Sequence, residues 1–191
     1  MMNIKSLSCL LVVLIQSISF TQWIPLDDFS TPNSQPNVQL ISDNDFSTVI
    51  KVDISGFQIN EFISDGKTYH SISISSEGIT TEAGYPEIPH IAKILAIPDQ
   101  GSVSIEVLET SPVQVFKGIN IPPARESWFE GEPESPYIEN MLAYASEDLY
   151  PINYAKVEDP VVFRDFRLSR VSIFPFRYLD PLSFTELYAP L

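Results

Sequence analysis

Prolines set among short apolar runs constrain the fold of this chain more than any other feature. In TEAGYPEIPHIAKILAIPDQG, residues 81–101, Pro86, Pro89 and Pro98 surround an apolar run, and Gly84 precedes it. Each proline fixes its own φ, removes a backbone donor and favours an extended conformation for the residue before it. A helix is therefore disfavoured here, and an extended segment bounded by turns is expected.

Several other segments alternate between apolar and polar residues, which indicates half-buried strands. These segments are STVIKVDISGF (Ile50, Val52 and Ile54 on one face), TYHSISIS (His70, Ile72, Ile74), GSVSIEVLE (Val103, Ile105, Val107) and VQVFKGINI (Val113, Val115). The run VVFRDFRLSRVSIFPFRY has mixed parity, so we expect a bulge near Arg170 or burial of both faces. Short strands separated by turns predict an all-β fold, an antiparallel, jelly-roll-like β-sandwich. The one helix candidate is SPYIENMLAYA, with Ser135 as its cap and Pro136 in its first turn.

The N-terminus has the pattern of a secretory signal peptide. Lys5 precedes an apolar stretch that is shorter than the roughly 20 residues of a membrane-spanning helix. We expect residues 1–21 to be the signal peptide, with cleavage after Ser19 or Thr21, and the protein to be secreted, extracellular or at the cell surface, with no membrane span. Residues 22–45 are rich in Pro, Ser, Asn and Asp, and are expected to be a flexible arm or linker. Residues 46–191 then form the sandwich, which we expect to be incomplete at its C-terminus.

Composition excludes several kinds of partner and chemistry. Cleavage of the signal peptide removes Cys9, the one cysteine, so the mature chain has no disulfide and no thiol nucleophile. The net charge of −14 argues against binding to nucleic acid or to an anionic membrane. Four arginines near the C-terminus are a local exception to this acidic composition, and they offer a basic patch for an acidic partner. They are Arg164, Arg167, Arg170 and Arg177.

The ionisable residues indicate no catalytic site, metal or cofactor. The candidates are the histidines His70 and His90, the pair Asp43 and Asp45, and the group Glu130, Glu132 and Glu134. A serine-type mechanism would need a histidine base and a G-x-S-x-G turn, and that turn is missing. The SDNDFS segment lacks the glycine and the distal glutamate of a calcium loop. EGEPESP is typical of a solvated loop, and no ligand spacing surrounds either histidine, so His90 is expected to be a surface or hydrogen-bonded side chain.

Three elements, in this order and spacing, resemble the N-terminal propeptide of gingipain-type cysteine peptidases. They are the G-x-P-x-[IL]-P turn at Gly84, Pro86, Ile88 and Pro89, the I-P turn at Ile97 and Pro98, and the P-x-R-Y-x-x-P element at Pro175, Arg177, Tyr178 and Pro181. The resemblance covers residues 70–185. It implies a β-sandwich that helps a peptidase fold and keeps it latent by covering its active-site cleft. The catalytic Cys and His then belong to a separate domain, the partner in cis or in trans, and this chain is not itself the enzyme.

The resemblance also implies one inhibitory candidate, Arg125, in the loop INIPPARESWFEGEPESP. Some relatives insert a basic side chain into the specificity pocket of their peptidase, and a guanidinium suits a pocket lined with carboxylates. The alternative is a surface arginine that pairs with Glu126 or Glu130. A turn-scaffold role, at corners where an edge strand enters and leaves a sheet, is expected for Gly84, Pro86, Pro89, Pro98, Pro175 and Pro181.

A binding module is the second hypothesis for the function. A free-standing secreted β-sandwich would bind a glycan or a surface protein through an aromatic platform, for which the candidates are Trp128, Phe129, Tyr137 and Tyr144. At SFTELYAPL the family pattern would continue into another strand and then the catalytic domain. Both alternatives, a fragment of a longer precursor and a free-standing relative, stay open at this point.

Overall fold

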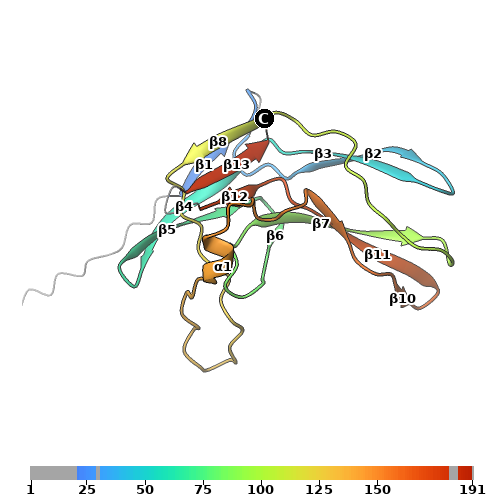
Figure 1. Ribbon diagram of the computed structural model, residues 1–191. Helices are drawn as coiled ribbons and strands as arrows, with labels where there is room; N and C mark the ends of the chain where they lie inside the picture. The colour runs from blue at the N-terminus through green and yellow to red at the C-terminus, as the bar shows by residue number, and fades with distance from the viewer. Residues whose placement is uncertain (1–20, 29–30, 181–184, 191) are drawn as a thin grey trace, which may run out of the picture.

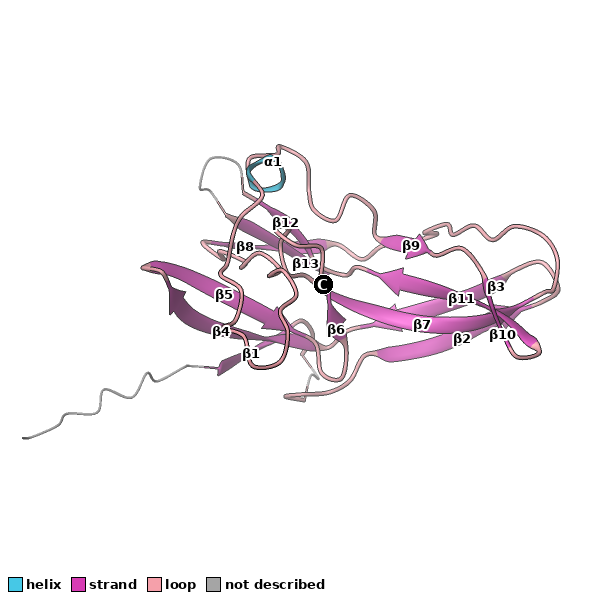
Figure 2. Ribbon diagram, turned by 90° about the horizontal axis from the view of Figure 1, so that it is seen from below, coloured by secondary structure: helices cyan, strands magenta, loops and turns pink. Residues whose placement is uncertain are grey.

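The computed structural model describes residues 21–28, 31–180 and 185–190, which form an all-β fold of antiparallel sheets, as predicted (Figure 1). The sheets have the orders β1-β4-β5, β10-β11-β7-β6 with β9 also paired to β11, and β12-β13-β8, and β2 pairs with β3. The strands are β1 (Thr21–Pro25), β2 (Asn37–Asp43), β3 (Thr48–Asp53), β4 (Gly56–Ser64), β5 (Lys67–Ser73), β6 (Gly78–Ile79), β7 (Pro89–Ile97), β8 (Val113–Lys117), β9 (Ala155–Val157), β10 (Val161–Phe163), β11 (Phe166–Ile173), β12 (Arg177–Leu179) and β13 (Glu186–Pro190). The described residues also form one short helix, α1 (Met141–Tyr144). In Figure 2, β1, β4 and β5 lie toward one end of the molecule, and β2, β3, β10 and β11 extend to the other.

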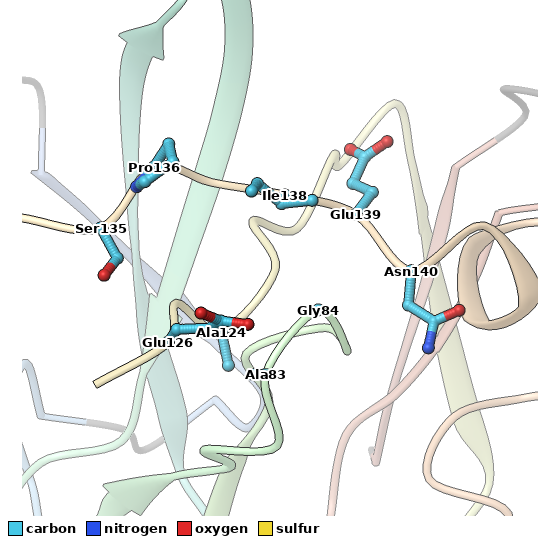
Figure 3. A pocket seen from close by; sticks show the side chains of 9 residues that line it. All are labelled: Ala83, Gly84, Ala124, Glu126, Ser135, Pro136, Ile138, Glu139 and Asn140. Atoms are coloured by element: carbon cyan, nitrogen blue, oxygen red, sulfur yellow. The ribbon is translucent and has the colours of Figure 1, made fainter. Parts of the chain in front are cut away.

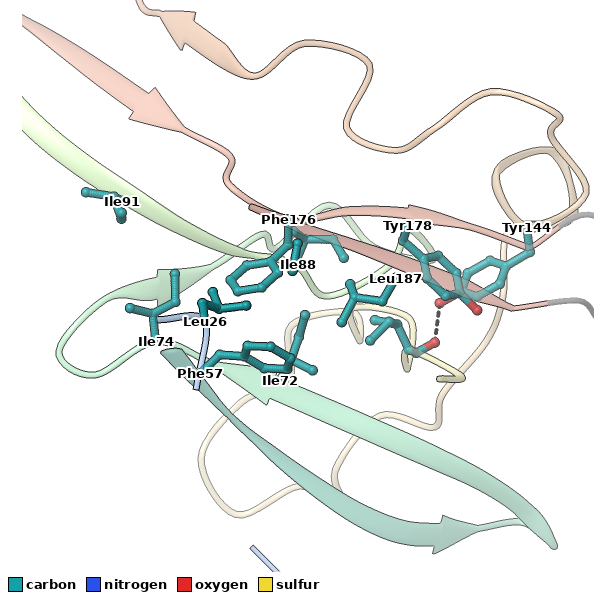
Figure 4. Packing of buried hydrophobic residues seen from close by; sticks show 12 residues of the cluster. Leu26, Phe57, Ile72, Ile74, Ile88, Ile91, Tyr144, Phe176, Tyr178 and Leu187 are labelled. Carbon is teal, nitrogen blue, oxygen red and sulfur yellow. Dashed lines mark hydrogen bonds between the residues drawn. The ribbon is translucent and has the colours of Figure 1, made fainter. Parts of the chain in front are cut away.

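One apolar core joins the sheets (Figure 4). Phe57 of β4 lies at its centre, with ring centroids 5.5 Å from Phe116 of β8 and 4.9 Å from Phe176, which precedes β12. Ile91 of β7 and Leu187 of β13 are also fully buried in this cluster. No cysteine occurs among the described residues, so their packing supplies what a disulfide does in many exported domains.

The β4–β5 hairpin shows how the local sequence produces these elements. Asp65 and Gly66 form its two-residue turn, and both have positive φ, 49° and 78°, as Asp-Gly turns between antiparallel strands require. After the turn, Ile72 is buried while Ser71 and Ser73 lie on the opposite face. The strand predicted from TYHSISIS is therefore confirmed, although the face of Ser71 and Ser73 also carries the buried Tyr69.

The segment 22–45 differs from the flexible arm that we expected, because two strands form in it. β1 pairs with β4 along its whole length, and β2 pairs with β3. Gly56 makes the first pairing possible: a Cβ on this residue would lie 2.6 Å from the carbonyl oxygen of Ile24 and 2.7 Å from Cε2 of Trp23. A short polar-rich strand whose partner lies further along the chain leaves little periodic signal in its own sequence.

The clear alternation of GSVSIEVLE does not form a strand. Residues 102–112 are extended but pair with no other strand in the described structure. Ile105 and Val107 instead line a shallow hollow with Ile152, Tyr154 and Arg177. Alternation shows that one face is apolar, but it does not show that a partner strand with free backbone groups is present.

The run of mixed parity at residues 161–178 folds as a hairpin, followed by β12. Arg164, with φ of 56°, and Asp165 form the turn between β10 and β11. β11 pairs with β7 in continuous register from Arg167 to Ile173, so the expected bulge near Arg170 is wrong. Burial of both faces is correct near the end of β11, where Val171 and Ser172 are both buried.

The single helix begins later than the sequence suggested. Its N-cap is Asn140, whose side-chain oxygen accepts a hydrogen bond from the backbone N–H of Leu142 at 3.0 Å. Ser135 and Pro136 precede it in an extended segment, so Ser135 is not the cap. Asparagine satisfies free amides at a helix start as well as serine does.

Replacing Phe57 by alanine should lower the free energy of unfolding by about 3–5 kcal/mol, since the change removes a buried ring and its edge contacts. Phe46→Ala is the matched control, because Phe46 is 97% exposed, and it should change stability by less than about 0.5 kcal/mol. Urea unfolding followed by circular dichroism measures both. Similar losses for the two variants would contradict the described core.

Candidate functional site

The projecting loop of residues 125–139 is tied at both ends to one glycine. The Gly84 N–H donates to the carbonyl oxygen of Ala124 at 2.8 Å, and the Gly84 carbonyl accepts from the N–H of Asn140 at 2.9 Å. Gly84 has φ of +82°, and a Cβ there would lie 3.1 Å from Cβ of Asn140. Glycine is therefore required on conformational and on steric grounds.

Arg125 lies at the start of this loop and is held by three side chains of the loop itself. Its guanidinium Nη1 is 2.5 Å from Oε2 of Glu134, and its Cζ lies 4.6 Å from the ring centroid of Trp128 and 4.9 Å from that of Tyr137. The Arg125 side chain is 21% exposed. The hydrogen bond with Glu134 raises the pKa of Arg125 above its ordinary value. The sequence suggested Glu126 or Glu130 as the partner, and the structure shows Glu134 instead.

The tip of the loop presents an aromatic side chain among carboxylates. Residues 129–132 form a turn in which the Glu132 N–H donates to the Phe129 carbonyl at 3.1 Å and Gly131 has φ of 91°. Phe129 is 79% exposed, and Glu130 and Glu132 lie beside it. In Figure 1 this loop extends furthest toward the lower side of the molecule.

A pocket of about 330 Å³ lies at the base of the loop (Figure 3). Its lining comprises Ala83, Gly84, Ala124, Glu126, Ser135, Pro136, Ile138, Glu139 and Asn140. Glu139 forms an ion pair with Lys67, so only part of the acidic lining is open to a ligand. Within the described ranges, no group of three His, Cys, Asp or Glu side chains could hold a metal ion.

The proline positions of the opening stretch lie where chain direction or pairing changes. Pro86 is buried and forms an isolated bridge with Pro123, and Pro89 is the first residue of β7. Pro98 follows β7, and its carbonyl oxygen accepts a hydrogen bond from Arg167 at 2.8 Å. Pro175 lies between β11 and β12. Pro181 lies outside the described residues.

His90 is buried in β7 and is not a surface residue. Its Nε2 lies 3.1 Å from Nη2 of Arg170, and because a guanidinium only donates, Nε2 is the acceptor and the proton resides on Nδ1. Nδ1 has no hydrogen-bond partner among the described residues. Burial, and then the charge of Arg170, lower the pKa of His90, against the opposing effect of Glu77 and Glu158.

The arginine group near the C-terminus does not form one basic patch. Arg167 donates to the carbonyl oxygens of Pro98 and Gly101, and Arg177 donates to Pro151. Arg170 contacts His90, and Arg164 occupies the β10–β11 turn. The four arginines therefore occupy separate local environments.

The proposed aromatic platform is also divided. The rings of Trp128 and Tyr137 face Arg125. Tyr144 is buried in the core and its hydroxyl donates to the Ile121 carbonyl at 2.9 Å. Phe129 is the most exposed of the four, Trp128 is 40% exposed, and Tyr144 cannot belong to a surface platform because it is buried.

The carboxylate-rich 125–139 loop, tied at both ends to Gly84, thus projects from an all-β domain. Comparison with protein families identifies the class of domain, since the model of the Propeptide_C25 family matches residues 30–187. The chain belongs to this family of gingipain-type propeptides.

The relatives are proteins of Porphyromonas gingivalis. Gingipain R1 is 24% identical over 160 residues and gingipain R2 is 22% identical over 159 residues, each covering 82% of this chain. The chain spans only 16% and 21% of the length of these two relatives. No helix in the described residues is long and apolar enough to cross a membrane.

Two solved structures share the fold. One, from work on the zymogenic latency of gingipain K, has a TM-score of 0.69 at 23% identity and covers 88% of this chain and 92% of its own. The other, the complex of the pro- and mature domains of RgpB, has a TM-score of 0.68 at 19% identity and covers 83% of this chain and 87% of its own.

Replacing Arg125 by alanine should make the 125–139 loop more susceptible to proteolysis, because Glu134, Trp128 and Tyr137 lose their common contact. Limited digestion with a glutamate-specific peptidase, followed by mass spectrometry, should show cleavage after Glu130 or Glu132 several-fold faster than in the wild type. Lys51→Ala removes another exposed cation paired with a carboxylate, on β3, and is the control. Equal cleavage rates in all three proteins would show that Arg125 does not order the loop.

The buried His90 should make stability depend on pH. Its pKa is lower in the folded than in the unfolded protein, where it is near 6.5, so the unfolded state binds the proton first and the folded state loses stability as pH falls below that value. Between pH 7.5 and 5.5 the wild type should lose up to about 1.4 kcal/mol more than His90→Phe. Urea unfolding at both pH values gives the difference, and an identical loss in the two proteins would refute the assignment.

Proposed function

We propose that this chain is the propeptide of a secreted cysteine peptidase precursor, which assists folding of the peptidase and keeps it latent by covering its active-site cleft. The observation that carries the proposal is the 125–139 loop, projecting from a domain of a propeptide family and tied at both ends to Gly84. A loop that is already ordered has less conformational entropy to lose when it binds. It can therefore contribute to tight association without chemistry of its own.

The charge of the loop favours a particular kind of cleft. Glu126, Glu130 and Glu132 are exposed, and after Arg125 no basic residue occurs until Lys156. Such a loop is complementary to a cleft with basic groups at its rim, and the exposed ring of Phe129 supplies an apolar anchor at the centre.

Arg125 contributes to inhibition, in this proposal, by holding the loop in shape. Insertion of its guanidinium into a specificity pocket would first break the contacts with Glu134, Trp128 and Tyr137. Two cation–π contacts and one partly exposed ion pair together contribute about 1–3 kcal/mol. Contacts with a carboxylate-lined pocket would have to contribute more than this free energy before direct insertion of Arg125 became favourable.

Export completes the proposal. The apolar N-terminal pattern of residues 1–21 supports a signal peptide, and the gingipain relatives support a secreted or surface protein. Of the two expected cleavage positions, Ser19 lies outside the described residues and Thr21 is the first residue of β1. In this proposal the peptidase domain of the precursor carries out catalysis, and this chain covers its active-site cleft.

Residues 22–191, added in trans, should inhibit the peptidase domain of the same precursor in a peptide-cleavage assay. Arg125→Ala and Glu134→Gln should each raise the inhibition constant by about tenfold, because both break the contact that orders the loop. Lys51→Ala should inhibit like the wild type.

The Glu134→Gln variant separates the two roles of Arg125. It frees the guanidinium, so stronger inhibition by this variant would show direct insertion of Arg125 and refute the holding role. Absence of inhibition by the wild type would reject the propeptide function itself and support a free-standing binding module.

A further inference from the structure

Five large apolar side chains of β7, β10 and β11 are exposed to solvent. Val161 and Phe163 are each 61% exposed, Phe166 is 62% exposed, Ile94 is 69% exposed and Val162 is 75% exposed. Residues directly opposite in an antiparallel pair lie on the same face of the sheet, as do residues two apart in one strand. Phe163 is opposite Phe166, so these two rings are neighbours on one face.

The same argument extends this face across the sheet. Val161 is opposite Leu168, Leu168 is opposite Ala96, and Ile94 lies two residues from Ala96. Ile94, Val161, Phe163 and Phe166 therefore share one face, whereas Val162, opposite Arg167, lies on the other face. We call this set, Ile94, Val161, Phe163 and Phe166, the apolar strip.

The strip lies on the outside of the fold. In β7 and β11, residues of the other parity, Ile91 and Val171, are buried, and Ile91 belongs to the core with Phe57 (Figure 4). β10 lies at the edge of the sheet, and its Val162 is exposed on the opposite face. The solvent-exposed face of an antiparallel sheet is usually polar. Apolar side chains gathered on an outer face are instead typical of a surface that another protein covers.

We propose that the apolar strip is a second docking surface for the peptidase domain of the precursor, engaged together with the 125–139 loop. This inference rests on the proposed propeptide function. The chain spans 16–21% of the length of gingipains R1 and R2, so a propeptide of this kind has a large covalent partner, and the RgpB pro-domain was solved in complex with its mature domain.

The placement of the strip supports this occupant. In Figure 1 the 125–139 loop and the β10–β11 hairpin both extend toward the lower side of the molecule, so one partner can contact both. In Figure 2, seen from that side, the hairpin and the loop lie at separate positions along the length of the domain. Two separated contacts on one rigid domain fix the orientation of a partner as one contact cannot.

The charges beside the strip specify the partner surface further. Arg170 lies opposite Ile94 in the register of β11 and β7, so it shares the face of the strip. Lys156 of β9 lies opposite Ser172. Because Ser172 is two residues from Arg170 in β11, Lys156 lies on the same face. The β10–β11 turn, with Arg164 and Asp165, adds one charge of each sign. The surface of the partner that matches the apolar strip is therefore apolar, with carboxylates along one side. The cleft of the partner that receives the acidic 125–139 loop is, by contrast, basic.

The test compares two double variants of residues 22–191. Phe163→Ser/Phe166→Ser removes two rings of the strip, and Leu40→Ser/Phe46→Ser removes two apolar side chains of the β2–β3 hairpin that are at least as exposed, at 62% and 97%. Binding to an active-site-blocked peptidase domain is measured by biolayer interferometry, with thermal melting as the check on folding and light scattering for self-association. The strip variant should bind at least about tenfold more weakly than the wild type, and the hairpin variant within about twofold of it.

Equal affinities of the strip variant and the wild type would refute this docking surface while leaving the propeptide function in place. A wild-type dimer that the strip variant abolishes would also refute it, since the strip would then join two copies of this chain. If the wild type did not bind the peptidase domain at all, the propeptide function and this inference would fail together. Weaker binding by both double variants to the same degree would count against a specific strip.

Discussion

The two backbone hydrogen bonds of Gly84 are the constraint on which the functional part of the structure depends. They bring Ala124 and Asn140 to the same residue, so a segment of fifteen residues, 125–139, leaves and returns at one place. The position of Gly84 is fixed by the two residues that follow it. The carbonyl oxygen of Tyr85 accepts a hydrogen bond from the N–H of Ala124, and Pro86 forms an isolated β-bridge with Pro123. A proline-rich stretch that forms no site of its own thus determines where the projecting loop begins and ends.

Much of the fold could be predicted from the sequence, and the successes share a cause. β3 and β5 show a period-two pattern in their own sequence, so a short window is enough to find them. β8 is a strand as predicted, but Val113 and Val115 are exposed and Phe116, of the other parity, packs against the core. β1 and the unpaired segment 102–112 could not be predicted, because strand formation there depends on a partner elsewhere in the chain. The room that Gly56 leaves for Trp23 is one such long-range condition.

The candidate site was predicted in its position but not in its contacts. The sequence singled out Arg125 and the loop around it, yet it could not show that Glu134, nine residues away, is the carboxylate in contact. Helical or strand periodicity would have restricted the choice of partner, and an irregular loop has neither. The roles of Gly84 as a tie for this loop, and of His90 as a buried neighbour of Arg170, likewise required the folded chain.

The position of β13 has a consequence for the order in which the protein folds. This strand is the last one described, yet it lies in the middle of its sheet, between β12 and β8, and places Leu187 in the core. Its pairing with β8 joins residues more than sixty positions apart, a contact of high sequence separation that forms slowly. The core of this domain therefore cannot close until residues 186–190 are available to pair with β8. Closure of the core is thus a late step in the folding of this domain, because it needs both members of a long-range pairing.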